Sequence, residues 1–501
     1  MRMRSLLLLL VLVCMVTATS VRASAQGRRE ANAPAVEGGV YRRPLGSDPA
    51  TLDPGRIRDI FGLSVAQQLF DGLVQFDQTL TITPALAQFW TASRDGLTWT
   101  FRLRRGVKFH HGREVTADDV VYSLTRILDP KVKSGSADLF ASIRGAQEFK
   151  EGKAKQVSGL TALDSHTVQV VLNEAWAPFV SILAVGHAKI VPKDLVEQQG
   201  EAFGAHPIGT GPFKFVRWEP GREIVLVANP DYFDGPPKLT RVVYRIFRGE
   251  EFDAMYEQFQ RGNLEDTPIP TQEYQRVAAA DKYIRVKRPL DRYTFARGIL
   301  PPGMMGFNPK LNGYAYDPQR ARDLLALAGY PGGRGLPPIQ IWSGVKLEKL
   351  LQEHEQIKKY LAAVGVQAEF HYETNWPSFS AMLTQGKFPM FLYAWFADVP
   401  HPDNFLFKLF HSRSPRNFTA HSNPVVDELL LEAKRERDLP RQTGLYRQAE
   451  QLVLDDAPIM PVWHYTYERL FQPYVRSVEV NGLGDPYIPL RKIWLDARPR
   501  P

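Results

Sequence analysis

The stretch 98–130, TWTFRLRRGVKFHHGREVTADDVVYSLTRILDP, decides the fold class of this chain. Over 99–103 bulky apolar residues alternate with polar ones, which predicts a half-buried strand. Thr116 is placed to cap a helix whose apolar positions run over 120–128, and Pro130 ends that helix. A strand that leads into an amphipathic helix is typical of α/β proteins.

The same pattern continues on both sides of this stretch. Helices are predicted over 317–329, 347–364, 425–437 and 441–454, and the second of them leads into an alternating strand over 366–372. Shorter strands are predicted over 167–172, 224–228 and 241–247. We therefore expect an α/β chain with mixed sheets.

The size and composition of the chain indicate a folded protein with more than one lobe. Of the 501 residues 44% are hydrophobic, which is too apolar for a disordered chain. Glycine and proline number 37 and 38, too few for a low-complexity or collagen-like sequence. Because a single core seldom grows to this length, we expect two or three lobes.

The first residues predict export. Arg2 and Arg4 precede an apolar run over 6–16, which is too short to span a bilayer, and an Ala-Ser-Ala exit ends at Ala25. This pattern predicts a cleavable secretory signal peptide over 1–25, with cleavage after Ala25. A flexible leader is expected over 26–39, and the mature protein is expected in the periplasm.

Removal of the signal changes the cysteine count and the charge. Cys14 is the only cysteine, so the mature chain is expected to have no disulfide and no thiol ligand, and Val13 argues against a lipid anchor at Cys14. The signal contains three of the 62 basic side chains and none of the 54 acidic ones, so the mature chain has 59 basic and 54 acidic side chains, a formal net charge of +5. Because the two signs are interspersed, no nucleic-acid partner is expected.

Motifs for catalysis are missing from the sequence. There is no G-x-S-x-G motif, and the pair His354-Glu355 lacks the second histidine of a zinc-protease helix because Lys358 stands there. The glycine-rich stretch 208–212 lacks a following Gly-Lys-Ser/Thr, so it predicts a tight turn between strands rather than a phosphate site. We expect no catalytic residue, no metal and no cofactor, although an exported hydrolase stays open as an alternative.

Histidines also give no ligand pattern. His110 and His111 are adjacent and would point apart on a strand. His401, His411 and His421 are ten residues apart, a spacing that fits neither one helix nor one strand, so we interpret them as surface or packing residues.

Several short motifs occur in a fixed order after the predicted signal. They are TLDP (51–54), QLFDGL (68–73), PALA (84–87), DGLTWTF (95–101), LRRGVKFHHGR (103–113), ADDV (117–120), PIGTGPF (207–213) and NPDYF (229–233). Together they resemble the extracytoplasmic solute-binding proteins of the dipeptide/oligopeptide/nickel class, family 5, of ABC importers. The resemblance covers nearly the whole mature chain.

The resemblance implies a periplasmic-binding-protein-like (type II) fold, a two-lobed clamp with mixed sheets and a hinge. Lobe I is expected over 40–266 plus 463–501 and lobe II over 267–462, with crossings near 266–270 and 461–465. Such a protein binds a peptide or peptide-like solute between its lobes and delivers it to the permease subunits of the importer in the inner membrane. It is expected to be a monomer and no enzyme.

The segment WFADVPHPDNF, residues 395–405, carries the expected ligand site. In peptide-binding relatives the matching acid pairs with the α-ammonium of the peptide, which implies this role for Asp398, with Trp395 as an aromatic wall. Trp376 matches a second aromatic residue, and Ile60 and Phe61 align loosely with the cleft edge. The expected ligand-binding residues are Asp398, Trp395, Trp376, Phe396, Ile60 and Phe61. Alternatively, Asp398 is a plain Asx-turn residue and the tryptophans belong to the core.

The sequence departs from the family pattern in one region. Only 38 residues separate Gly262 from Pro301, and they lack the Arg-Gln-Ala-like helix of relatives. His401 also replaces the usual acid two residues before Asp403. We therefore expect a strand and a helix of lobe II to be missing or replaced. An altered ligand (a nickel complex, haem or an oligosaccharide) or a docking role stays open for this reason.

Overall fold

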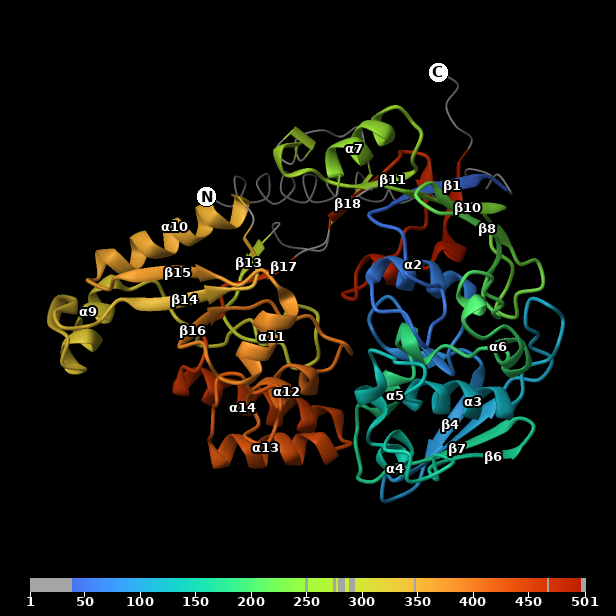
Figure 1. The fold of residues 1–501 in the computed structure, drawn as a ribbon, viewed down its shortest axis with the longest axis horizontal. Helices are drawn as coiled ribbons and strands as arrows, with labels where there is room; N and C mark the ends of the chain where they lie inside the picture. Colours follow the sequence, from blue (N-terminus) through green and yellow to red (C-terminus); the bar gives the residue numbers. More distant parts are fainter. Residues whose placement is uncertain are drawn as a thin grey trace, which may run out of the picture.

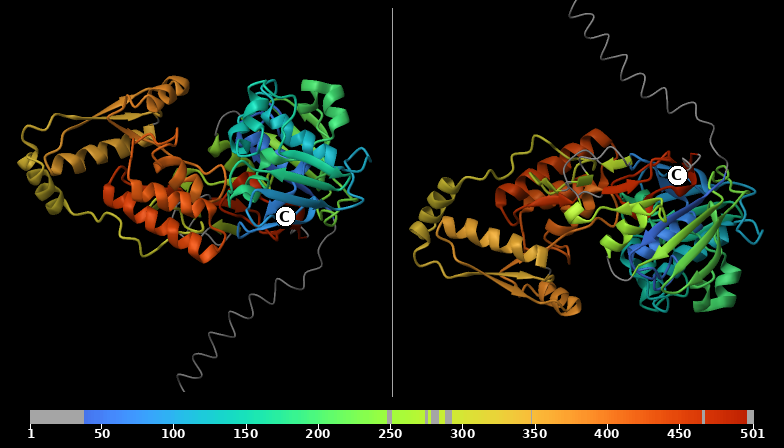
Figure 2. Two further views of the ribbon diagram at one scale, coloured as in Figure 1. Left: turned by 90° about the horizontal axis from the view of Figure 1, so that it is seen from below. Right: turned by 90° about the horizontal axis from the view of Figure 1, so that it is seen from above.

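The computed structural model shows two lobes joined by short strands (Figure 1). It describes residues 38–247, 251–273, 276–277, 284–287, 293–346, 348–465 and 468–496. Blue to green segments and the red C-terminal segment form lobe I, and yellow to orange segments form lobe II (Figures 1 and 2). The predicted signal and leader lie outside the described residues, apart from positions 38 and 39.

One four-stranded sheet of lobe I joins a strand at the start of the described chain to three strands from the middle of the sequence. Its order is β1 (Val40–Leu45), β10 (Arg241–Ile246), β9 (Glu223–Ala228), β8 (Phe213–Glu219), and β1 runs parallel to β10 while the other pairs are antiparallel. The core beneath it includes Leu69 of α2 (Ile60–Leu69) and the C-terminal residues Phe471 and Ile493. The C-terminal segment is thus part of the lobe I core.

The second sheet of lobe I includes the strand that begins the stretch 98–130. Its order is β4 (Ala87–Ala92), β5 (Thr98–Leu103), β7 (Thr167–Val171), β6 (Leu160–Asp164), all antiparallel. The predicted helix is α3 (Ala117–Leu128), and the Asp119 carboxylate accepts from Thr116 N at 2.9 Å as part of a capping box. Val120 and Leu124 of α3 are fully buried. The predicted strand and helix are both confirmed.

The glycine-rich stretch 208–212 corrects one expectation. It is no tight turn between two strands but a loop that precedes β8 and lies against the end of α2. Gly211 N donates to Leu69 O at 2.9 Å, and a Cβ on Gly209 would collide with that carbonyl oxygen. The glycines are needed because two backbones approach closely here.

The other elements of lobe I surround these sheets. They are β2 (Val74–Phe76), β3 (Ile82–Pro84), η1 (Ala137–Phe140), α4 (Ala146–Lys150), α5 (Phe179–Ile182), η2 (Gly186–Ala188), α6 (Lys193–Gln199), η3 (Gly200–Gly204), α7 (Phe252–Gln260), β19 (Val475–Arg476), η7 (Asp485–Tyr487), η8 (Leu490–Lys492) and β20 (Trp494–Leu495).

A small sheet lies between the lobes. It consists of β11 (Asp266–Pro268), β18 (Glu468–Phe471) and β12 (Ile284–Lys287), with β18 in the middle. The short helix η4 (Thr271–Glu273) lies between β11 and β12 in the sequence. Next to it β13 (Tyr293–Phe295) pairs with β17 (Trp463–Tyr465). These strands lie between the two lobes in Figure 1. The lobe boundaries at 266/267 and 462/463 stay a prediction.

Lobe II has an outer sheet and an inner helical layer (Figure 2). In the outer sheet β14 (Ile339–Ser343) lies between the parallel strands β15 (Ala368–Tyr372) and β16 (Met390–Leu392). Around it lie α9 (Pro318–Leu327), η5 (Pro331–Gly333), α10 (Glu348–Ala363) and α11 (Trp376–Thr384). The inner layer comprises η6 (Pro402–Asn404), α12 (Leu406–Phe410), α13 (Pro424–Arg435) and α14 (Leu439–Asp456). The helices and the strand predicted for this half are confirmed.

Within the part of the chain that the structure describes, no helix combines the length and the apolar character that a bilayer crossing requires.

Candidate functional site

The loop that follows β16 in lobe II holds Trp395 and Asp398 in fixed positions through Asn404. Trp395 Nε1 donates to Asn404 O at 3.0 Å, and Asp398 N donates to Asn404 Oδ1 at 3.2 Å. The following residues Phe405 and Leu406 are buried in the core of the inner helical layer. The loop is therefore anchored to packed helices rather than left free.

The carboxylate of Asp398 is paired with Lys408, a residue that the sequence did not single out. Lys408 Nζ donates to Asp398 Oδ2 at 2.5 Å, and Asn404 Nδ2 lies 3.4 Å from the same oxygen. The ammonium of Lys408 also lies 5.3 Å from the centre of the Trp395 ring, a cation–π contact. The Asp398 side chain, at 44% exposure, binds side chains rather than the backbone of an Asx turn.

Two buried polar groups of lobe I, His187 and Tyr487, lie within electrostatic range of Asp398. Burial lowers the pKa of His187, and the Asp398 charge is near enough to raise it in part. Burial likewise raises the pKa of Tyr487 to about 12, with Asp398 adding to the rise. Tyr487 Oη accepts from Gly186 N at 3.1 Å, so η7 and η2 are held together opposite the loop.

The two lobes also touch beside this site. Val399, which follows Asp398, is 3% exposed and packs into a core cluster of lobe I. Lys434 of α13 donates to Glu174 at 2.6 Å, and its carbonyl oxygen accepts from Ala177 N at 3.0 Å. Arg437 donates to Ser93 O at 3.0 Å. The loop thus lies at the interface of the lobes.

Two buried titratable residues, His401 and Asp403, follow Asp398 in the same loop. Burial raises the pKa of Asp403 to about 6, and Tyr446 Oη donates to Asp403 Oδ1 at 3.3 Å. Burial lowers the pKa of His401 to about 3, and its Nδ1 accepts from Asp403 N at 3.2 Å. His411 and His421 are 3% and 7% exposed, which agrees with a packing role.

Metal-ligand clusters are also absent among the described residues, where no group of three His, Cys, Asp or Glu side chains is placed to hold an ion.

The other expected site residues occupy less defined places. Ile60 is 54% exposed at the start of α2, and Phe61 is half-buried with its ring close to Gly46. Because α2 packs against η7, both lie on the part of lobe I that carries Tyr487. Phe396 is 59% exposed. Trp376 begins α11, and its side chain lies outside the described part of the structure.

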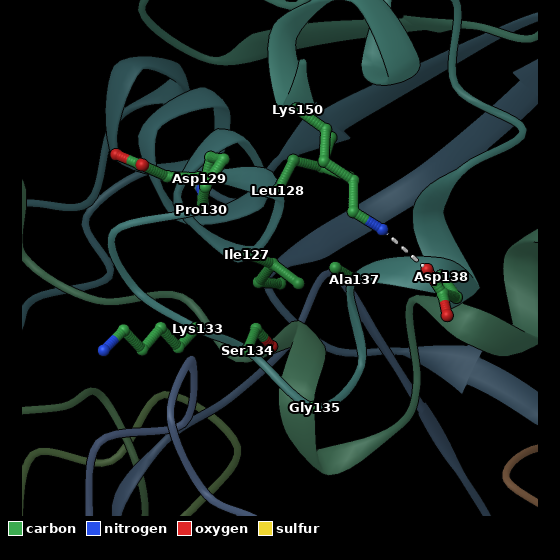
Figure 3. A pocket seen from close by; sticks show the side chains of 10 residues that line it. All are labelled: Ile127, Leu128, Asp129, Pro130, Lys133, Ser134, Gly135, Ala137, Asp138 and Lys150. Atoms are coloured by element: carbon green, nitrogen blue, oxygen red, sulfur yellow. Dashed lines mark hydrogen bonds and ion pairs between the residues drawn. The ribbon is translucent and has the colours of Figure 1, made fainter. Parts of the chain in front are cut away.

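A small pocket opens in lobe I at the end of α3 (Figure 3). Its volume is about 190 Å³, and Ile127, Leu128 and Ala137 give it an apolar lining. At its rim Lys150 Nζ donates to Asp138 Oδ1 at 2.9 Å. The Lys150 ammonium lowers the pKa of Asp138, and the charges of Arg416 and Lys408 in lobe II contribute. The pocket rim therefore lies within electrostatic reach of the Asp398–Lys408 pair.

Comparison with known proteins gives a family match over most of the chain. The model of the bacterial extracellular solute-binding proteins, family 5 (middle), matches residues 81–297 and 290–417. The two matched segments overlap at residues 290–297. The heme-binding protein A of Haemophilus influenzae is 28% identical over 507 residues, which cover 88% of this chain and 89% of that protein.

Solved structures match nearly the whole chain. The unliganded open form of the periplasmic murein tripeptide-binding protein MppA has a TM-score of 0.79 at 25% identity, covering 93% of this chain and 99% of that one. The periplasmic binding protein DppA from Helicobacter pylori, in complex with the peptide STSA, has a TM-score of 0.72 at 25% identity, covering 92% and 98%. The predicted type II two-lobed fold is confirmed.

Proposed function

Because the chain belongs to the bacterial extracellular solute-binding proteins of family 5, we propose that it is the solute-binding component of an ABC importer. It binds a peptide or peptide-like solute between its lobes and hands it to the permease subunits in the inner membrane. The similarity to a murein tripeptide-binding protein and to a binding protein in complex with a peptide supports the solute class. No covalent step is needed, because a clamp works through a difference in affinity between its open and closed states.

One observation carries this proposal. A single anchored loop of lobe II presents the Asp398 carboxylate and the Trp395 ring at the lobe interface, within electrostatic range of His187 and Tyr487 of lobe I. A carboxylate enclosed with a polar group of a solute forms a charge-assisted hydrogen bond worth about 1.5 to 3 kcal/mol. Trp376, Phe396, Ile60 and Phe61 complete the proposed solute-binding set.

Closure follows from a hinge between the lobes. The short strands β11, β12 and β18, and the pair β13–β17, lie between the lobes and support a hinge there. The expected crossings near 266–270 and 461–465 fall on or beside β11 and β17. The mature chain starts after Ala25, is periplasmic and acts as a monomer.

A thermal-shift screen tests the proposal. Purified mature protein is heated with di- and oligopeptides, glutathione, nickel complexes, haem and oligosaccharides, each at several concentrations. A solute at 100 times its Kd stabilises the folded state by about 2.7 kcal/mol, which raises Tm measurably. Haem is included because one relative is a heme-binding protein. Each candidate is recovered afterwards and expected to be unchanged, whereas a hydrolase would convert it.

Variants link the binding to the site. Asp398→Ala is expected to reduce the Tm shift given by the best solute. Asp164→Ala is the matched control, since Asp164 is an exposed lobe I carboxylate paired with Arg102. If no solute raises Tm, or if Asp398→Ala behaves like the control, the proposed site is wrong.

A further inference from the structure

We infer that Lys408 selects the solute: its ammonium occupies the Asp398 carboxylate and directs the protein toward peptides with a blocked, uncharged amino end. The inference rests on the proposed function and deepens it. It concerns the charge of the group that the Asp398 loop accepts.

The Asp398–Lys408 pair is built into the loop. Lys408 follows Asn404 by four residues, on the short helix α12, and Asn404 fixes the backbone of Asp398. The Lys408 ammonium is held twice, at 2.5 Å from Asp398 Oδ2 and at 5.3 Å from the Trp395 ring centre. The two features expected to receive a solute ammonium, a carboxylate and an aromatic face, therefore already hold one.

A free α-ammonium would have to displace Lys408. Bringing a second cation to the same carboxylate places two like charges within a few ångströms, which disfavours the charged form of either. The displaced Lys408 would also lose its cation–π contact. An acyl carbonyl has no such conflict, because a lysine carries three N–H donors and one of them serves Asp398.

The surroundings do not offset the charge of Lys408. Facing it from lobe I, burial lowers the pKa of His187 and raises the pKa of Tyr487, so both are neutral near pH 7. Asp138 feels the charges of Arg416 and Lys408 but already has Lys150 as its partner at 2.9 Å. The interface near Asp398 thus has no excess of negative charge to attract an ammonium.

The test uses one pool of random tripeptides, half of which is acetylated at the amino end. Dissociation constants for the free and acetylated pools are measured by titration calorimetry for wild type, Lys408→Met, Lys408→Arg and Lys359→Met. Lys359 is an exposed lysine of α10 and serves as the charge-matched control. Circular dichroism and Tm without peptide check that each variant is folded.

We expect wild type to bind the acetylated pool more tightly than the free pool. Lys408→Met is expected to shift the ratio toward the free pool by about tenfold, the factor that a charge-assisted hydrogen bond supplies. Lys408→Arg and Lys359→Met should keep the wild-type preference.

The outcomes separate the two claims. If wild type prefers the free pool, or if Lys408→Met keeps the wild-type ratio, the inference is overturned while the proposed function stands. If folded protein binds neither pool in any variant, peptide binding itself is contradicted.

Discussion

Lobe I and the outer sheet of lobe II differ sharply in how well they are packed. Lobe I has two large core clusters in which Phe101 and Tyr244 are fully buried. The cluster at the outer sheet has three buried members, Phe379, Leu383 and Phe388. Helix α9 buries none of its residues, and Leu327 is 85% exposed. Lobe I therefore has large buried cores, whereas the outer sheet of lobe II buries few apolar side chains.

The thin packing is seen in the exposure of apolar side chains around the outer sheet. Among the described residues the β14 sheet has three strands. Apolar side chains that a covering element would bury, such as Tyr316 and Leu324, are 75% and 54% exposed. The candidate site escapes this weakness because its loop is anchored to the inner layer, which lies between the outer sheet and lobe I (Figure 2).

The largest effect is expected from Arg43→Met in lobe I. Arg43 is 1% exposed and donates to Asp485 at 2.6 Å, with Asp266 at 3.4 Å. Removing the Arg43 guanidinium leaves the negative charge of the fully buried Asp266 less well neutralised, which lowers the free energy of unfolding by about 3 to 5 kcal/mol. Arg102→Met, in an exposed pair, should cost less than about 1 kcal/mol. Denaturant unfolding measures both; equal losses would show that the lobe I frame does not depend on this network.

A matched pair of leucines compares the lobes directly. Leu124 on α3 is fully buried, so Leu124→Ala should lower the free energy of unfolding by about 2 to 5 kcal/mol. Leu327→Ala on α9 should change it by less than about 0.5 kcal/mol, because the side chain is in water. A comparable loss at both sites would contradict the described difference in packing.

Asp403 gives the inner layer a pH dependence. Its pKa is raised to about 6 by burial, from an unfolded value of about 3.9. The stability of wild type relative to Asp403→Asn is therefore greatest below about pH 4 and falls by about 1.4 kcal/mol per pH unit up to about pH 6. The neighbouring His401 has the opposite sign, since its pKa is lowered to about 3.

The lowered pKa of His401 means that its contribution to the free energy of unfolding is fully present at neutral pH and is lost as the pH falls below about 6.5. Taking the difference between wild type and Asp403→Asn at each pH removes this second contribution. Urea unfolding at pH 4, 5, 6 and 7 supplies the measurement. A difference that does not change with pH would mean that Asp403 is charged in the folded protein.

The smallest effects are expected at two helix caps. Asp59 accepts from Gly62 N at 2.7 Å at the start of α2, and Asp317 accepts from Arg320 N at 2.9 Å at the start of α9. Each change to alanine removes about 1 kcal/mol of helix stability. Because α9 has little packing to hold it, Asp317→Ala should raise amide exchange across α9, while Asp59→Ala leaves α2 protected. Similar exchange in both helices would argue against the contrast.

Local features of the fold could be predicted from the sequence, while long-range ones could not. The strand Thr98–Leu103 was predicted from the alternation of apolar and polar residues, and the helix Ala117–Leu128 from its capping residue and apolar spacing. Both signals lie within the elements themselves or next to them. The pairing of β1 with β10 joins residues 201 positions apart, which no local pattern specifies. The prediction of a tight turn at 208–212 was wrong because the glycines there are required by close contact with the backbone of α2, which is distant in sequence.

The candidate site shows the same limit. Asp398 and Trp395 could be named from a short motif, and the structure brings both together with Asn404. Lys408 was missed because a cation ten residues away matches no helical or strand spacing, and only the fold of α12 brings it to Asp398.

The central claim is that the lobes close on a solute, and the distance between them tests it most directly. Since Cys14 is the sole cysteine and lies in the predicted signal, cysteines introduced at Arg102 of lobe I and Lys359 of lobe II can be spin-labelled specifically. The distance distribution is recorded without and with saturating acetylated tripeptide pool. Closure of the lobes on the peptide predicts a shorter distance with peptide; binding that leaves the distribution unchanged would contradict closure.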